Sequence, residues 1–261
     1  MDLADRVCVV TGGAGGIGAA LARRFVAEGA GAVVITDLVE DRTARAAAEI
    51  GCIGIPCDVT DEEAVARLVR HVLSDLGRID LFASNAGASV DGGVEVRDGD
   101  WQRLWNLHVM AHVYAARAVL RPMIAAGGGY LLQTVSAAGL LASLTSLPYT
   151  VTKTASLALA EWLAITYRQA NIRVSAVCPL VVDTPLAARF HLDGGAGLAM
   201  SPDEVAEAVV EGVRDERFLI LPHPEVADFM DRKASDRDRW LAGMSRLFEH
   251  VTSETGADAS S

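Results

Sequence analysis

Tyr149 and Lys153 are four residues apart in a segment whose pattern predicts a helix over residues 148–170, so their side chains share one face. A phenol ordinarily titrates near pH 10 and is a poor base at neutral pH. An ammonium about 4 Å away would contribute roughly 4 kcal/mol at an effective dielectric near 20, which lowers the phenol pKa by at most about three units. The pair therefore predicts an acid–base catalyst, with Tyr149 transferring the proton.

Ser136 follows the strand predicted at residues 130–134, just before this helix. Its hydroxyl could share a substrate oxygen with Tyr149 and hold that oxygen in line for transfer. Each residue also has a plainer interpretation: Tyr149 as a surface aromatic, Lys153 as a solvated charge and Ser136 as a turn residue. Their joint occurrence after a nucleotide-binding pattern favours catalysis.

That pattern is the glycine-rich segment Thr11-Gly-Gly-Ala-Gly-Gly-Ile-Gly18, between an apolar run at residues 7–10 and a helical pattern. Glycine allows a sharp turn and close approach of a pyrophosphate to backbone N–H groups at the start of a helix. A tight turn without a ligand is the alternative. The predicted contacts are Gly12, Gly15, Gly16, Ile17 and Gly18.

Asp37 closes the next apolar run, residues 32–36, where a carboxylate can accept both hydroxyls of an adenosine ribose. The same carboxylate would repel a 2′-phosphate, so the expected cofactor is NAD rather than NADP. Arg42 is the nearby cation that could alter this preference. Asp37 could alternatively serve only as a helix cap.

Strand and helix patterns alternate along most of the chain, which predicts a parallel sheet covered on both faces and hence a doubly wound α/β fold. We expect one domain over residues 1–250, a flexible substrate loop at 183–200 and a disordered tail at 251–261. The expected strands are 7–10, 32–36, 53–55, 79–83, 130–134, 173–177 and 218–221, and the later helices are 41–49, 61–76, 100–125, 148–170, a helix from 201, and 225–250.

Five motifs together resemble the short-chain dehydrogenase/reductase family over about residues 5–222: the glycine segment, Asp58-Val59, Asn85-Ala86-Gly87, Ser136 and Tyr149-Thr-Val-Thr-Lys153. The resemblance implies a Rossmann-type sheet of seven parallel strands and a nicotinamide cofactor. It also implies a homotetramer or homodimer built on two long helices.

The resemblance implies further cofactor contacts. Asp58 and Val59 match positions that hold the adenine ring, and Asn85, Ala86 and Gly87 match a stretch that supports the sheet beside the cofactor. Thr184 matches a residue that touches the carboxamide. The remaining implied contacts are Tyr149, Lys153, Pro179 and Val182.

The sequence departs from the family at His108, where an asparagine usually stands seven residues after a tryptophan, here Trp101. Asn106 would point to another helix face. We expect His108 to take part in the proton relay and to add a titration near neutral pH, or else the relay is impaired. His108 and His112 could also ligate a metal, but no third ligand is evident and we expect none. Leu180 stands where the family commonly has glycine beside the nicotinamide.

Composition limits the partners and the compartment. The formal net charge of −11 disfavours nucleic acid. Residues 122–152 carry no charged side chain, but their glycines and polar groups argue against a membrane span. The four cysteines lack zinc-site spacing and the amino terminus is acidic, so we expect reduced thiols and a cytoplasmic location. The positive mean hydropathy favours an oligomer.

The expected activity is interconversion of a secondary alcohol and a ketone with NAD(H). An apolar wall from Ala138, Leu140, Leu141, Leu180 and the loop 183–200 favours a hydrophobic substrate. Two alternatives stay open: a reductase of 3-oxoacyl thioesters, which commonly uses NADPH, and a non-catalytic nucleotide-binding protein.

Overall fold

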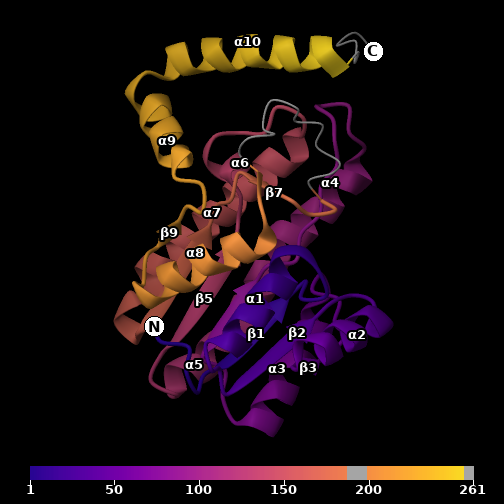
Figure 1. The fold of residues 1–261 in the computed structure, drawn as a ribbon, viewed down its shortest axis with the longest axis vertical. Helices are drawn as coiled ribbons and strands as arrows, with labels where there is room; N and C mark the ends of the chain where they lie inside the picture. The colour runs from indigo at the N-terminus through magenta and orange to yellow at the C-terminus, as the bar shows by residue number, and fades with distance from the viewer. Residues whose placement is uncertain (187–198, 256–261) are drawn as a thin grey trace.

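Seven parallel strands form the central sheet in the order β3-β2-β1-β4-β5-β6-β9 (Figure 1). The computed structural model describes residues 1–186 and 199–255. The strand cores are buried runs of branched apolar residues, as expected for a sheet covered on both faces. The predicted seven-stranded doubly wound fold is confirmed. The strands are β1 (Val7–Thr11), β2 (Ala32–Thr36), β3 (Ile53–Gly54), β4 (Leu81–Ser84), β5 (Gly129–Thr134), β6 (Ile172–Val177) and β9 (Leu219–Ile220).

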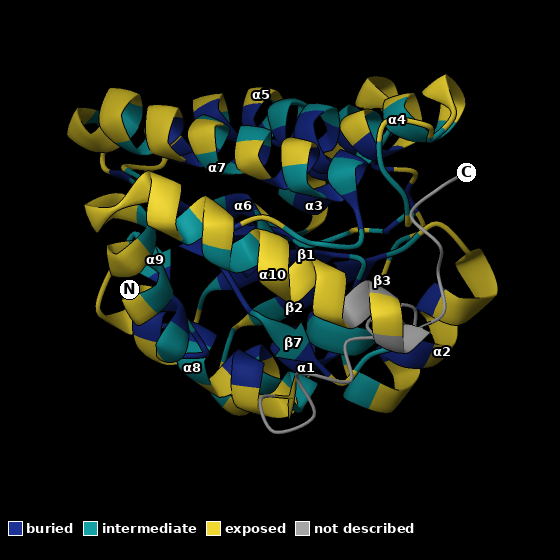
Figure 2. Ribbon diagram, turned by 90° about the horizontal axis from the view of Figure 1, so that it is seen from above, coloured by how far each residue is buried: buried dark blue, intermediate teal, exposed yellow. Residues whose placement is uncertain are grey.

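Two layers of helices cover the sheet, as Figure 2 shows. One layer packs Leu21, Phe25 and Val209 against the sheet, and the other packs Val69 and Val119. The first layer consists of α1 (Gly16–Ala27), α2 (Glu40–Ile50) and α8 (Pro202–Arg214), and the second of α3 (Glu62–Leu76), α5 (Ala111–Ala125) and α7 (Leu147–Tyr167). β1 lies between β2 and β4, so the chain segments that follow β1 and β4 pass to opposite faces of the sheet. Their divergence opens a crevice at the carboxyl ends of these strands.

The helix predicted at residues 100–125 is not regular. It comprises α4 (Asp98–Trp105), a π-helical turn η1 (Asn106–Met110) and α5. A π-turn adds one residue to a helical turn, and such turns are frequent at functional sites. Apolar periodicity does not reveal a single added residue, so the prediction of one continuous helix was wrong here.

The C-terminal region differs from its prediction. Residues 225–250 form two helices, α9 (Glu225–Ser235) and α10 (Arg237–Thr255), separated at Asp236, whose backbone is extended. The carboxylate of Asp236 accepts a hydrogen bond from the Arg239 N–H at 2.9 Å, which fixes the start of α10. Because α10 continues through Thr255, the disordered tail predicted from residue 251 is wrong for residues 251–255; residues 256–261 lie outside the described part.

Four short elements complete the fold: α6 (Ala137–Leu140), η2 (Arg168–Ala170), β7 (Val181–Val182) and β8 (Ala199–Met200). The end of the predicted 183–200 loop is therefore a strand, since β8 pairs with β7, and residues 187–198 lie outside the described part. The uncharged segment 122–152 forms the end of α5, then β5, α6 and the first turns of α7. Within the described chain, no helix is both long and apolar enough to cross a membrane.

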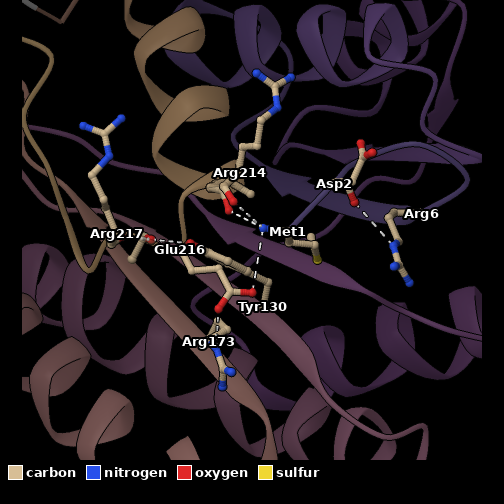
Figure 3. Close-up of polar contacts among 10 residues, drawn as sticks. Met1, Asp2, Arg6, Tyr130, Arg173, Arg214, Glu216 and Arg217 are labelled. Carbon is tan, nitrogen blue, oxygen red and sulfur yellow. Dashed lines mark hydrogen bonds and ion pairs between the residues drawn. The ribbon is translucent and has the colours of Figure 1, made fainter.

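Polar contacts hold the amino ends of the strands together, at the edge opposite the crevice (Figure 3). The Met1 amino group donates to the carbonyls of Val213 and Arg214 at 2.5 and 3.1 Å. The Tyr130 hydroxyl lies 2.6 Å from that of Ser175. These groups serve stability and stand apart from the crevice.

Candidate active site

Two connected cavities open at the carboxyl ends of the strands. A cleft of about 640 Å³ runs along the glycine loop and the ends of β2 and β4. A second cavity of about 430 Å³ lies beneath α9 and α10. Tyr149 lines both cavities, together with Ile17, Pro179, Thr184 and Leu186. Its side chain is therefore accessible to groups bound on either side.

The glycine loop is built for close backbone approach. Gly12 has a φ of +64°, and a Cβ there would lie 2.9 Å from the Ala86 Cα. A Cβ on Gly18 would lie 2.2 Å from the Gly12 carbonyl oxygen, so this position must be glycine for packing reasons. Gly18 does not line the cleft, so its contact with a cofactor stays a prediction, while its small size sets the spacing of α1 from the loop.

The start of α1 offers a place for an anion. Gly15, Gly16 and Ile17 line the cleft, and no side chain caps the helix at Gly15. The first N–H groups of a helix have no partner within the helix and carry a partial positive charge. This uncapped end fits the pyrophosphate of a dinucleotide.

Asp37 borders the far end of the cleft. Its carboxylate accepts hydrogen bonds from the N–H groups of Leu38 at 2.8 Å and Ala14 at 3.3 Å. Val39, not Asp37, occupies the N-cap position of α2, so the helix-cap interpretation is wrong. Arg42 lines the same end of the cleft. One of its guanidinium nitrogens lies close to Gly15, 3.6 Å from the position that a Cβ atom on this glycine would take.

Asn85 ties together the strand ends beneath the cleft. Its amide group donates to the Thr11 carbonyl at 3.0 Å, and the Thr134 hydroxyl donates to its Oδ1 at 3.0 Å. The N–H groups of Asn85 and Ala86 both donate to the Thr11 hydroxyl. These bonds hold β1, β4 and β5 in one arrangement at the base of the cleft.

Most of the remaining predicted contacts border the cleft, but Val182 does not. Those that do are Asp58, Val59, Asn85, Ala86, Gly87, Lys153, Pro179 and Thr184. Val182 lines the second cavity instead. The side chain of Asp58 is held by Thr60, whose N–H and hydroxyl both donate to it.

Tyr149 and Lys153 lie on one face of α7, as their spacing predicts, but the expected electrostatics are different. Burial raises the pKa of Tyr149 to about 12, and a hydrogen bond with Ser136 opposes this only in part. The Lys153 ammonium donates to the Thr134 carbonyl at 2.8 Å and lies 5.6 Å from the centre of the Tyr149 ring. The predicted lowering of the phenol pKa is therefore wrong for the protein alone, because desolvation by burial dominates the shift.

Lys153 is itself affected by its surroundings. Only 2% of its surface is exposed, and burial lowers its pKa to about 8. An ammonium in such a place is held by its hydrogen bond to the backbone rather than by a carboxylate.

Ser136 is the N-cap residue of α6 and faces the second cavity beside Tyr149. Its hydroxyl accepts a hydrogen bond from the Ala138 N–H at 3.1 Å, and its own proton can be donated to the Tyr149 hydroxyl or to a substrate oxygen. The two hydroxyls therefore converge at the junction of the cavities.

His108 lies at the centre of η1 and is fully buried. Its Nε2 accepts from the Ala88 N–H at 3.2 Å, and its Nδ1 lies 2.9 Å from the Thr152 hydroxyl. That hydroxyl donates to the Pro148 carbonyl, so the imidazole is neutral with its proton on Nδ1. Burial, reinforced by Lys153, holds the pKa of His108 well below its usual range, so the expected titration near neutral pH is wrong.

We expect the pH–rate profile of His108→Asn to overlay that of the wild type between about pH 6 and pH 9. The imidazole does not change its protonation state in this range, because its pKa is held well below the usual value. Steady-state kinetics with one alcohol and one ketone would measure both profiles. A displaced midpoint in the variant would restore a relay role for the ring.

His112 is buried beside Gln133, and burial lowers its pKa to about 3. The spacing from His108 had suggested a metal pair. Among residues 1–186 and 199–255, no three His, Cys, Asp or Glu side chains are grouped so that they could hold an ion.

The second cavity has the apolar wall expected from Ala138, Leu141 and Leu180. Leu140 does not line it but packs into the core, and its carbonyl accepts a hydrogen bond from Lys233 at 2.5 Å. The opposite wall comes from α9 and α10, and the sequence gives no local sign that these helices return over the site. That wall consists of Phe229, Arg232, Trp240, Met244 and Leu247.

Comparisons with known proteins agree with this architecture. The family model for short chain dehydrogenases matches residues 6–193. The cis-4-hydroxycyclohexanecarboxylate dehydrogenase of Sinomonas cyclohexanicum is 36% identical, over 84% of this chain and 93% of its own length. The 1-deoxy-11-beta-hydroxypentalenate dehydrogenase of Streptomyces exfoliatus is 34% identical, over 86% of each chain. A short-chain dehydrogenase/reductase from Burkholderia phymatum, solved in complex with NAD, has a TM-score of 0.83 at 24% identity, covering 91% of this chain and 96% of that one.

The chain belongs to the short-chain dehydrogenase/reductase family. The family match and the relatives named as dehydrogenases mark it as an oxidoreductase.

Proposed function

We propose that this protein is an NAD(H)-dependent oxidoreductase that interconverts a hydrophobic secondary alcohol and its ketone, with Tyr149 as general acid and base. The observation that carries the proposal is the position of Tyr149 at the junction of the two cavities. Relatives named for the oxidation of ring and chain alcohols support this substrate class.

The cleft residues fit a dinucleotide. The uncapped start of α1 would bind the pyrophosphate, and Asp37 would accept the ribose hydroxyls. Asp58 and Val59 would border the adenine, and Pro179 and Thr184 would border the nicotinamide. The structural relative solved with NAD supports the same choice of cofactor.

When bound, a nicotinamide cofactor supplies or accepts the hydride. Tyr149 donates its proton to the carbonyl oxygen during reduction and takes it back during oxidation. Its raised pKa keeps the proton in place at neutral pH, which prepares the protein for reduction. Ser136 donates a hydrogen bond to the same oxygen and holds it in line.

Lys153 acts beside the phenol. Its ammonium, fixed by the Thr134 carbonyl, favours the phenolate that forms when Tyr149 gives up its proton. The electrostatic stabilisation that the ammonium gives to Tyr149 is small while the phenol is protonated. It is largest when negative charge develops on the phenol oxygen.

The test is turnover of a panel of secondary alcohols and ketones with NAD(H) and NADP(H) in parallel. Faster turnover with the phosphorylated cofactor would favour the alternative of a 3-oxoacyl thioester reductase. Binding of NADH without turnover of any substrate would favour a non-catalytic nucleotide-binding protein.

We expect Asp37→Ser to shift the ratio of kcat/KM for NADH over NADPH toward NADPH by about 10- to 100-fold. Removal of the carboxylate ends its repulsion of a 2′-phosphate, while Arg42 stays nearby as a positive group. Arg42→Ala in the same background should reverse part of the gain. An unchanged ratio in Asp37→Ser would place the cofactor preference elsewhere.

We also propose a homodimer or homotetramer assembled through the α5–α7 layer. Trp162 and Ile165 of α7 are 57% and 78% exposed, an unusual state for large apolar side chains on a long helix. A cytoplasmic location remains part of the proposal and agrees with four cysteines that form no disulfide.

A further inference from the structure

The described part of the second cavity combines an apolar wall with a single charge. Of the described residues that line it, Arg232 is the only one with a charged side chain. Tyr149 and Ser136 lie on the α6–α7 side of the cavity, and Arg232 belongs to α9 on the opposite wall. The cavity thus presents hydroxyl groups on one side and a guanidinium on the other.

Arg232 is an exposed residue whose guanidinium lies beside an aromatic ring. Its guanidinium carbon lies 5.8 Å from the centre of the Phe229 ring, and Phe229 lies 6.5 Å from Trp240. Both rings line the same cavity. A guanidinium beside an aromatic ring keeps its N–H donors for a further partner.

Residues 1–186 and 199–255 supply no such partner. Many arginines here pair with carboxylates, for example Arg24 with Glu28 and Arg173 with Glu216. In the described part of the chain, no Asp or Glu side chain forms an ion pair or hydrogen bond with Arg232. This is notable in a protein with a net charge of −11, where acidic groups are plentiful.

We propose that Arg232 binds a carboxylate of the substrate, so that the substrate is a hydroxy or oxo acid with an apolar body between its two polar ends. This proposal rests on the proposed function. A carboxylate matches the planar guanidinium with two parallel hydrogen bonds, and the apolar wall suits a hydrocarbon ring or chain. A neutral hydrophobic substrate would desolvate the guanidinium without compensation, which disfavours it.

Paired probes test the charge of the substrate. We would measure kcat/KM for hydroxycyclohexanecarboxylates, with the hydroxyl at C3 or C4, and for the matching carboxamides, which are similar in shape but uncharged. In the wild type the carboxylate should exceed the carboxamide by about 10- to 100-fold, the range of a hydrogen-bonded charge pair. Arg232→Met should remove this preference, with the loss of kcat/KM falling on the carboxylate. Arg232→Lys should restore part of it.

Arg239→Met is the matched control. Arg232 and Arg239 both line a groove between α9 and α10, but only Arg232 lines the cavity that contains Tyr149. The control removes the same charge from the same region, so the carboxylate preference should persist. Loss of the preference in both variants would indicate a general electrostatic effect and overturn the assignment to Arg232.

Two further results with Arg232→Met would overturn the assignment. One is an equal loss of kcat/KM for the carboxylate and the carboxamide, and the other is a preference for the carboxylate that stays as large as in the wild type. Calorimetry measures the binding of cyclohexanecarboxylate and cyclohexanecarboxamide in the presence of NADH. Because it does not require turnover, it tests the carboxylate site separately from the proposed function. If no alcohol is turned over but the carboxylate still binds more tightly through Arg232, the proposed function fails and the binding site stands. If the carboxylate binds no better than the amide, the binding site fails.

Discussion

Tyr149→Phe is expected to lower kcat/KM for both alcohol and ketone by about 10³- to 10⁴-fold, while the dissociation constant for NADH changes by less than about threefold. Removal of the hydroxyl eliminates the proton donor at the junction of the cavities, and general acid–base catalysis contributes factors of about this size. The ring remains to fill the same space beside His108, from which it lies 5.4 Å. Steady-state kinetics and a fluorescence titration with NADH measure the two effects.

Tyr130→Phe is the control for this experiment. It also removes the hydroxyl of a buried tyrosine, but at the amino end of β5, where the hydroxyl contacts Ser175 (Figure 3). Ser175 keeps its hydrogen bond to the Arg217 carbonyl in this variant. Its activity should be unchanged, with a loss of stability of about 1 kcal/mol. If Tyr149→Phe loses no more activity than Tyr130→Phe, the assignment of the general acid is wrong.

Lys153→Met is expected to lower kcat/KM by about 10²- to 10³-fold and, at neutral pH, to raise the free energy of unfolding. The loss of activity follows from removing the ammonium that favours the phenolate. The gain in stability follows from removing a charge that folding desolvates, since burial lowers the pKa of Lys153 from 10.5 to about 8. This shift corresponds to a penalty on the order of 3 kcal/mol, partly offset in the variant by the lost hydrogen bond to Thr134.

The pH dependence of this gain has a definite sign. Below about pH 8, Lys153 is protonated in both the folded and unfolded states, so the wild type bears the full penalty. Between about pH 8 and 10.5 the folded state releases its proton first, and the wild type recovers stability that the variant has no means to gain. The stability difference between variant and wild type should therefore be largest below pH 8 and shrink above it, as measured by denaturant unfolding of the protein without cofactor.

Lys233, the other lysine of the sequence, supplies the comparison. Its ammonium also donates to a backbone carbonyl, that of Leu140, but it is less buried. Lys233→Met should keep kcat/KM within a few fold. A stability difference for Lys153→Met that does not vary with pH would show that the lysine is not charged in the folded protein at neutral pH.

The sequence by itself determined the fold and the main parts of the candidate site. Alternating strands and helices require a parallel sheet, and the glycines after β1 lie at its carboxyl edge wherever the rest of the chain goes. The spacing of Tyr149 and Lys153 places them on one helix face by geometry alone. These features depend on local periodicity and chain order, which a sequence records directly.

Only the tertiary structure decided the environment of these groups. The pKa of Tyr149 rises instead of falling, and His108 stays neutral, because desolvation depends on how many atoms from distant elements surround a side chain. The added residue of η1 leaves no trace in the apolar pattern. The position of Arg232 in the cavity that Tyr149 lines follows from the packing of α9 beside this cavity, and the break at Asp236 then places Trp240 of α10 on the same wall. Contacts between segments far apart in the chain create these properties, so no local pattern could predict them.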